Sequence, residues 1–114
     1  MTQKSPITTH ILDIGSGQPA AGVSVTLEKI VDGQATVIAR SDTDNDGRLV
    51  DWLEKPVTEG HYRLRFATGH WYEKKGLATF YPEIVLDFQV TDEDEHYHVP
   101  LLLNQWGYST YRGS

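Results

Sequence analysis

The side chains best suited to catalysis in this sequence are a few imidazoles and guanidinium groups: His10, Arg48, His98 and Arg112. An imidazole titrates near neutral pH and can take a proton from water. A guanidinium binds planar carbonyl groups through paired hydrogen bonds and stabilises negative charge that develops on oxygen. Together these groups favour general acid-base hydrolysis of a small carbonyl-rich substrate.

Other catalytic chemistries have weaker support. The chain has no cysteine, which excludes disulfides, thiolate zinc sites and a cysteine nucleophile. It also has no Gly-x-Ser-x-Gly elbow, no His-Glu-x-x-His motif and no glycine-rich phosphate loop before a helix. An open zinc site built from His10, His96 and His98 is an alternative, although no carboxylate ligand accompanies it. We predict neither a metal nor another cofactor.

The segment from Asp42 to Gly47 matches the first half of a calcium-binding loop, with glycine at the sixth position. The twelfth position holds Leu53 where a bidentate glutamate is needed, and a strand pattern precedes the loop. We therefore favour an Asp/Asn/Gly turn that directs Arg48, the residue after the glycine.

Length and charge limit the protein's class. With 114 residues and 39% hydrophobic residues, the chain is predicted to form one globular domain, residues 1–114. A net charge of −6 argues against nucleic acid and anionic membranes as partners. No apolar run is long enough for a transmembrane helix, and the N-terminus lacks a signal-peptide core. We expect a soluble cytoplasmic protein, or a periplasmic one if a signal peptide was removed.

Period-two alternation of apolar and polar residues predicts an all-β protein. The expected strands are 7–14, 22–31, 35–41, 48–50, 61–67, 84–90 and 96–104, with a last strand starting at residue 108. A turn is expected at 15–19, and residues 69–77 lack the alternation and are predicted to form a short helix. Short strands at hairpin spacing favour a β-sandwich.

Alternation also assigns faces to the strand 96–104. His96, His98, Pro100 and Leu102 share one face, while the opposite face is apolar enough to cover a core. The polar face has two interpretations: it lines a site, or it is an ordinary solvated surface.

Four segments give the sequence a resemblance to a known family. They are HYHVPLLLNQWGYSTYRGS at 96–114, HILD at 10–13, DGR at 46–48 and FYPE at 80–83. In these segments the chain resembles the 5-hydroxyisourate hydrolases, the transthyretin-related enzymes of purine breakdown. The resemblance covers nearly the whole chain, and the terminal YRGS is its most specific part.

The resemblance implies a transthyretin-like sandwich of two four-stranded sheets with one short helix. It implies a homotetramer, a dimer of dimers with sites at the dimer–dimer interface. The implied reaction is hydrolysis of 5-hydroxyisourate to 2-oxo-4-hydroxy-4-carboxy-5-ureidoimidazoline. The catalytic residues carried over are His10, Arg48 and His98, without a metal.

The resemblance also assigns roles near the chain end. Tyr111, Arg112 and Ser114 are expected to bind the substrate or close its site. His96 does not match a catalytic position of the family and is expected to be supporting or solvent-exposed. His61 and His70 are expected at the surface.

Two other functions stay open at this point. The chain could be a transthyretin-like carrier of small aromatic ligands, whose channel would lack two imidazoles and an arginine. It could also be a monomeric β-sandwich adhesion module, which would differ from the hydrolase in oligomeric state.

Overall fold

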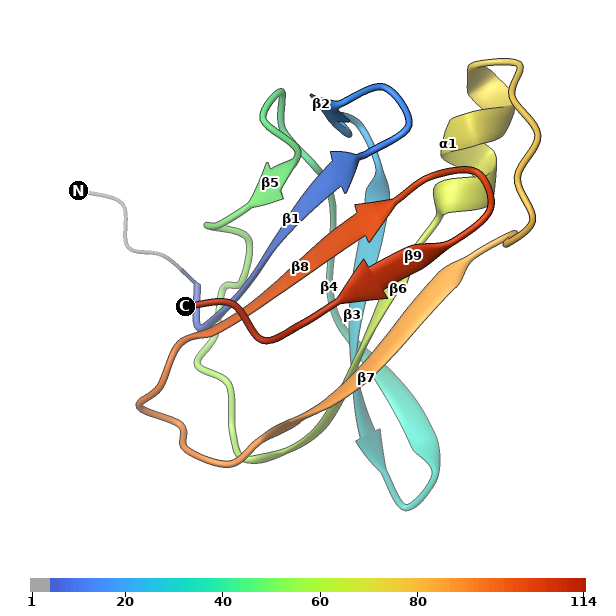
Figure 1. Ribbon diagram of the computed structural model, residues 1–114. Coiled ribbons are helices and arrows are strands. Elements are labelled where there is room, and N and C mark those ends of the chain that lie inside the picture. The colour runs from blue at the N-terminus through green and yellow to red at the C-terminus, as the bar shows by residue number, and fades with distance from the viewer. Residues whose placement is uncertain (1–4) are drawn as a thin grey trace.

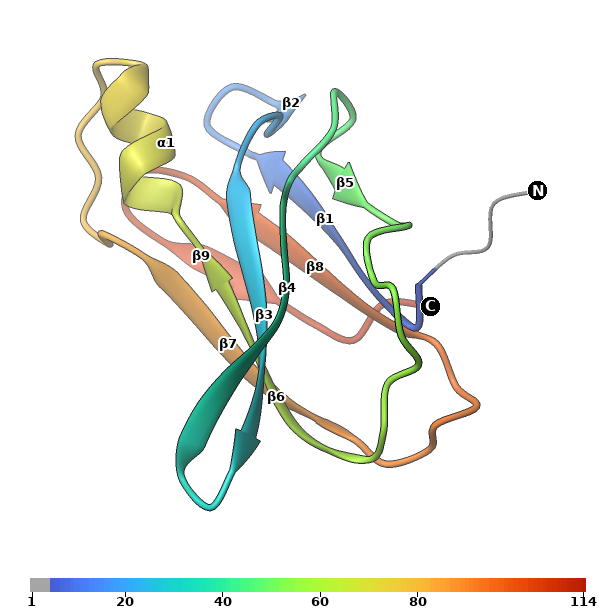
Figure 2. The same ribbon diagram turned by 180° about the vertical axis from the view of Figure 1, so that it is seen from behind.

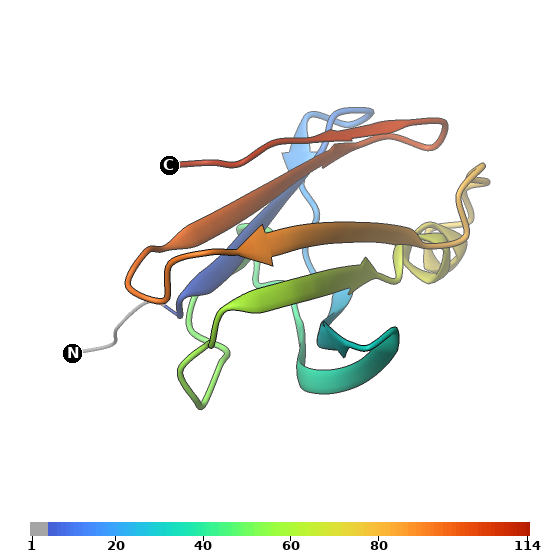
Figure 3. The same cartoon turned by 90° about the horizontal axis from the view of Figure 1, so that it is seen from below.

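The computed structural model describes residues 5–114, which form two packed β-sheets and one short helix (Figures 1 and 3). The first sheet has the order β2-β1-β8-β9, with β5 also paired to β1. Its strands are β1 (Ile7–Asp13), β2 (Gln18–Pro19), β5 (Arg48–Leu49), β8 (Tyr97–Leu103) and β9 (Tyr108–Thr110). The second sheet, β4-β3-β6-β7, consists of β3 (Ser24–Val31), β4 (Gln34–Asp42), β6 (Gly60–Phe66) and β7 (Ile84–Val90).

Alternating burial along the strands explains the sandwich. In β6, Tyr62, Leu64 and Phe66 are buried, while the residues between them are partly exposed. Strand β8 shows the same pattern except at Pro100, which is also buried, and its apolar side joins the core with the second sheet. Packing of these two apolar faces removes both from water and supplies the main stabilising contribution. The all-β sandwich predicted from alternation is confirmed.

The first sheet differs in detail from the expected four strands. Residues 15–19 were predicted to be a turn, but Gln18 and Pro19 at its end pair with Asp13 and Leu12 of β1. Counting this two-residue strand, the sheet has five strands.

The predicted helix exists as α1 (Thr68–Lys74), shorter than expected at its C-terminal end. The N–H of Gly76, at φ +72°, bonds the carbonyl of Glu73 and closes the last turn. No helix within residues 5–114 is long and apolar enough to cross a bilayer.

The parallel pairing of β1 with β8 places the first and penultimate strands of the chain side by side (Figure 1). In this register Thr8 lies opposite His98, and His10 lies opposite Pro100. The short β5 pairs with β1 as well, as the view from behind shows (Figure 2). Three segments far apart in sequence therefore meet along β1.

Candidate active site

His10 and Arg48 are direct cross-strand neighbours. The antiparallel register of β1 and β5 sets His10 opposite Arg48. Residues opposite one another in a sheet project from the same face, with Cβ atoms about 5 Å apart. Because the His10 side chain is half-buried and that of Arg48 is exposed, the pair presents an imidazole and a guanidinium to one accessible surface.

The turn before Arg48 holds this strand against β1. The carboxylate of Asp44 accepts hydrogen bonds from the backbone N–H of Asp46 and of Arg48, both at 2.9 Å. The Gly47 carbonyl accepts the N–H of Ile11 at 2.7 Å, and Gly47 itself has φ +73°. A Cβ there would lie 2.5 Å from the Ile11 carbonyl oxygen, so glycine is required. The segment is thus the predicted turn that directs Arg48.

His98 reaches the same face of the sheet from β8. It lies two residues before Pro100, the residue opposite His10, and side chains two apart on a strand share a face. The imidazole of His98 is half-buried, and its Nδ1 lies 2.8 Å from Oγ1 of Thr8. The structure therefore brings together His10, Arg48 and His98, the three residues expected to be catalytic.

The chain end folds over His98. After β9 the tail continues to Gly113, whose N–H donates to the His98 carbonyl at 2.8 Å. A Cβ on Gly113 would lie 2.6 Å from Cδ2 of the imidazole and 3.2 Å from Cγ of Pro100. Only a glycine can approach the ring this closely without moving it, so the tail fixes one side of the imidazole.

Replacement of Gly113 by alanine is expected to displace either the tail or the His98 ring, because the added methyl overlaps the ring edge. We expect a loss of activity of about tenfold or more, since a small misplacement of a catalytic group is costly. Thermal unfolding should change little, because Gly113 is near the chain end. Gly107, where a Cβ meets open space, provides the matched control as Gly107→Ala. Equal activity of both variants would contradict this role.

The other tail residues are placed differently. Tyr111 is 60% exposed and Ser114 is also exposed, next to the segment that covers His98. Arg112 donates to the Glu95 carboxylate at 3.1 Å, and its guanidinium carbon lies 4.5 Å from the centre of the Tyr97 ring.

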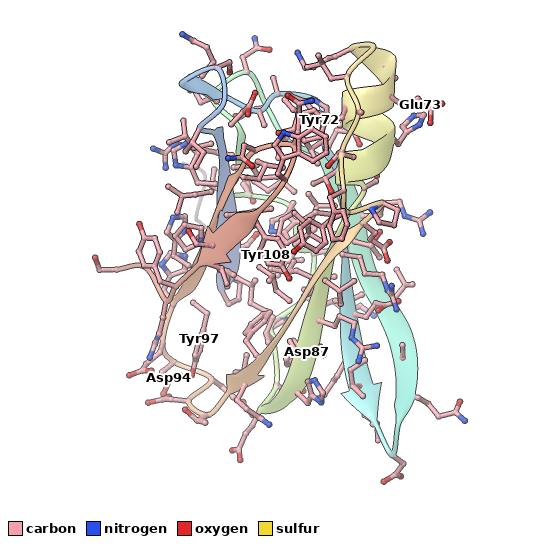
Figure 4. The ribbon with its side chains drawn as sticks, turned by 45° about the vertical axis from the view of Figure 1, so that its right-hand side comes forward. Tyr72, Glu73, Asp87, Asp94, Tyr97 and Tyr108 are labelled. Carbon is pink, nitrogen blue, oxygen red and sulfur yellow. The ribbon has the colours of Figure 1, made fainter. Side chains whose placement is uncertain are left out.

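Because Tyr97 belongs to the buried face of β8, Arg112 is directed away from the face of His98. Figure 4 shows Tyr97 beside the loop that carries Asp94, where β8 begins. The hydroxyl of Tyr97 accepts the N–H of Asp92 at 2.9 Å, which ties this ring to the same loop. Arg112 therefore ties the tail to the start of β8, and the structure does not bring it to the three catalytic candidates.

Burial and charge tune His10. Partial burial lowers the pKa of His10 below 6.5, and the positive charge of Arg48 lowers it further. A hydrogen bond to the Asp46 backbone and the carboxylates of Asp44 and Asp46 act in the opposite direction but do not reverse the shift. The lowered pKa favours the neutral form of His10, which has a lone pair able to accept a proton.

Removing the charge of Arg48 is expected to raise the pKa of His10. In Arg48→Gln the positive charge that lowers the pKa of His10 is gone, while the effect of burial remains. The pKa of His10 should therefore rise toward its ordinary value. An NMR titration of the His10 ring protons in both proteins measures this change directly. An unchanged or lower pKa in the variant would show that Arg48 does not act on this imidazole.

The remaining histidines lie outside this group or at its edge. His61 lies 2.7 Å from the Asp87 carboxylate at the surface, and His70 is exposed on α1. His96 is exposed, and its ring stacks on that of His98 at a centroid distance of 6.3 Å. Within residues 5–114, no three His, Asp or Glu side chains are grouped as a metal ion would require. His10, His96 and His98 therefore do not form a metal-ligand set.

Sequence reasoning missed Thr8 as part of the site, and it placed Gly113 in the terminal segment that closes the site without assigning it a contact of its own. Alternation placed Thr8 on the face of His10, but a threonine on a strand carries no functional signal by itself. Gly113 was visible only as part of the terminal motif. Both residues contact His98 of β8, which lies 90 positions after Thr8 and about 15 positions before Gly113 in the chain.

Comparison with known proteins agrees with this architecture. The HIUase/Transthyretin family model matches residues 7–113. The 5-hydroxyisourate hydrolase of Salmonella dublin is 50% identical over 109 residues, covering 95% of this chain and 80% of that protein. The structure of Klebsiella pneumoniae 5-hydroxyisourate hydrolase matches with a TM-score of 0.85 at 34% identity, covering 99% of this chain and 100% of that one.

Transthyretin from Sparus aurata also matches, with a TM-score of 0.89 at 30% identity, covering 95% of this chain and 96% of that one. Hydrolases and a transthyretin thus share this sandwich. The chain belongs to the HIUase/Transthyretin family.

Proposed function

We propose that this protein hydrolyses 5-hydroxyisourate to 2-oxo-4-hydroxy-4-carboxy-5-ureidoimidazoline. The observation that carries the proposal is the shared sheet face of His10, Arg48 and His98, reached from β1, β5 and β8. Relatives that carry the name 5-hydroxyisourate hydrolase, at up to 50% identity among those compared, support the same reaction. Two imidazoles and a guanidinium suit the opening of a cyclic amide by water.

In the proposed mechanism, one imidazole removes a proton from the attacking water. His10 and His98 are both candidates for this base, and the other imidazole orients the substrate or protonates the departing nitrogen. Arg48 binds the substrate carbonyls and stabilises the oxyanion that forms during attack. The chemistry needs no covalent intermediate on the protein.

The chain end completes the site in this proposal. Tyr111 and Ser114 wall off solvent or contact the substrate beside His98. Arg112, which was expected to bind the substrate, is proposed to act through its contacts with Glu95 and Tyr97, which hold the tail in place. Its guanidinium would then support the site without touching the substrate.

The ultraviolet decay of freshly prepared 5-hydroxyisourate tests the reaction. The absorbance should fall much faster with the protein than in buffer alone or with an unrelated protein at equal concentration. A decay equal to the buffer rate would overturn the proposal. The transthyretin-like carrier would then be favoured, and binding of an iodinated aromatic ligand without turnover would support it.

The assembly is proposed to be a homotetramer, a dimer of dimers with sites shared between dimers. Strand β9 lies at one end of the first sheet and β7 at one end of the second. Within the described residues, the outer edge of each strand pairs with no other strand. Such edges are typically paired or covered in native proteins, and edge pairing would join two subunits. Light scattering on the purified protein should give four times the mass of 12.9 kDa. A monomer would favour the adhesion-module alternative.

A cytoplasmic location, or a periplasmic one after signal removal, belongs to the same proposal.

A further inference from the structure

A single buried hydroxyl links two imidazoles at the edge of the site. Oγ1 of Thr8 lies 2.8 Å from Nδ1 of His98 and 2.9 Å from Nε2 of His96. Thr8 is only 1% exposed. A hydroxyl has one hydrogen to donate and lone pairs to accept with. Thr8 therefore donates to one ring and accepts from the other, so the proton positions of the two rings depend on each other.

The fold holds the three groups in this arrangement. Thr8 lies opposite His98 in the parallel register, on the strand that also carries His10. The two imidazoles project from the same face of the β8 segment, with their ring planes 29° apart. Gly113 packs against the ring edge of His98. The hydroxyl belongs to a buried residue, and Gly113 restricts one edge of the His98 ring.

The two ends of this chain of hydrogen bonds lie in different electrostatic surroundings. At one end is His98, on the sheet face that carries His10 and Arg48. At the other end is the exposed His96, whose ring borders a surface hollow that also contains Lys55. The hollow is lined by five carboxylate residues, Asp51, Glu54, Glu93, Asp94 and Glu95.

The hollow beside His96 contains several groups of the kind that stabilise a protonated imidazole. Carboxylates near an imidazole stabilise its protonated form, whereas a nearby guanidinium destabilises it. Two cations temper the acidic end: Lys55, and Arg112, which pairs with Glu95 and also approaches the His96 carbonyl at 3.4 Å. The hollow at the His96 end is thus lined by more carboxylates than cations.

We propose that His98, Thr8 and His96 form a proton-exchange path, in which Thr8 is a positioning residue and His96 is the solvent end. The inference rests on the proposed hydrolysis. In the starting state His98 carries its proton on Nδ1 and donates to Thr8, which donates to Nε2 of His96. When His98 Nε2 takes a proton from water, the Nδ1 proton passes to Oγ1 of Thr8. The hydroxyl proton passes to His96, which then releases a proton to solvent.

Each turnover places a proton on His98 and removes it again. Hydrolysis of a cyclic amide yields a carboxylic acid and an N–H group. Because a carboxylic acid has a pKa of about 4 and the freed ureido nitrogen is not basic, each turnover releases one net proton at neutral pH. This net proton leaves from the product acid itself, whereas the proton that His98 takes from water passes to the departing nitrogen. While His98 holds that proton on Nε2, the path removes the Nδ1 proton toward solvent and keeps the ring neutral. When Nε2 donates to the departing nitrogen, Thr8 returns a proton to Nδ1 and His96 takes one from solvent, so both rings regain their starting tautomers.

Substitutions of Thr8 separate the effect of its hydroxyl from the effect of its branched side-chain shape. Thr8→Val keeps the branched side chain and is expected to lower kcat by about 10- to 100-fold with little change in KM. Thr8→Ser restores the hydroxyl and should recover most of the activity. Thr9→Val is the matched control, because the Thr9 hydroxyl is also buried on β1 but bonds the Val99 carbonyl at 2.6 Å. If Thr8→Val and Thr9→Val behaved alike, Thr8 would have no special role.

Substitution of His96 tests the solvent end with a variant at an exposed position. His96→Gln should slow turnover most in dilute buffer, and added imidazole should restore it by exchanging the proton with solvent instead. His70→Gln, at an exposed position on α1, should show neither effect. A His96→Gln rate equal to wild type in dilute buffer would overturn the proton-exchange path.

Nitrogen NMR of the His96 and His98 rings tests their hydrogen-bond linkage through Thr8 without substrate. The measurement therefore separates this inference from the proposed function. Above the pKa of both rings, one of the two nitrogens that face Thr8 should carry a proton and the other should not. In Thr8→Val this complementary pattern should be lost. Two protonated or two bare nitrogens in the wild-type protein would refute the linkage, even if 5-hydroxyisourate is hydrolysed. Failure of the wild-type protein to hydrolyse it would instead refute the proposed function.

Discussion

Replacement of His98 by alanine is expected to lower kcat/KM for 5-hydroxyisourate by about 10²- to 10⁴-fold, the usual contribution of a general acid or base. The ring is held on one side by the Thr8 hydroxyl and on another by the tail at Gly113. An imidazole this constrained is preorganised for proton transfer, and its loss cannot be compensated by a neighbouring side chain that moves into its place. The ultraviolet decay of the substrate measures the effect.

Two comparisons make this result specific to His98. His70→Ala removes an exposed imidazole from α1 and should leave the rate and the melting temperature unchanged. His98→Asn keeps a polar side chain of similar length, which limits the cavity beneath the tail. A folded His98→Ala or His98→Asn protein that turned over at the wild-type rate would remove His98 from the mechanism.

Arg48→Gln is expected to cost about 10²- to 10³-fold in kcat/KM, because an oxyanion or carbonyl clamp contributes that much when it is removed. The backbone around Arg48 should not change, since the turn is held by the N–H of Arg48 bonded to Asp44 and by the carbonyl of Gly47. The variant therefore isolates the guanidinium from the turn that carries it.

Arg48→Lys distinguishes charge from geometry. Lysine keeps the positive charge but cannot form two parallel hydrogen bonds to a planar group, so we expect it to restore only a minor part of the lost rate. Full activity of the lysine variant would mean that Arg48 contributes charge alone. Wild-type activity of the glutamine variant would exclude Arg48 from the site.

The sequence alone determined the features that depend on neighbours along the chain. Alternation in 96–104 separated the face of His98 from the buried face of Tyr97 and Leu101, and burial follows that assignment except at Pro100, which is buried. The turn chemistry of the segment that ends at Gly47 predicted a loop that directs Arg48. These signals are local, because side-chain direction in a strand and the conformation of a short turn depend on residues within a few positions.

The tertiary structure decided which faces meet and in what register. The parallel pairing of β1 with β8 joins residues about 90 positions apart, and only this register sets Thr8 between His96 and His98. The direction of Arg112, toward Glu95 and the ring of Tyr97, was likewise outside the reach of the sequence. The register between distant strands is set by the burial of two whole sheet faces against each other. This burial depends on many residues at once, so no local sequence pattern predicts it.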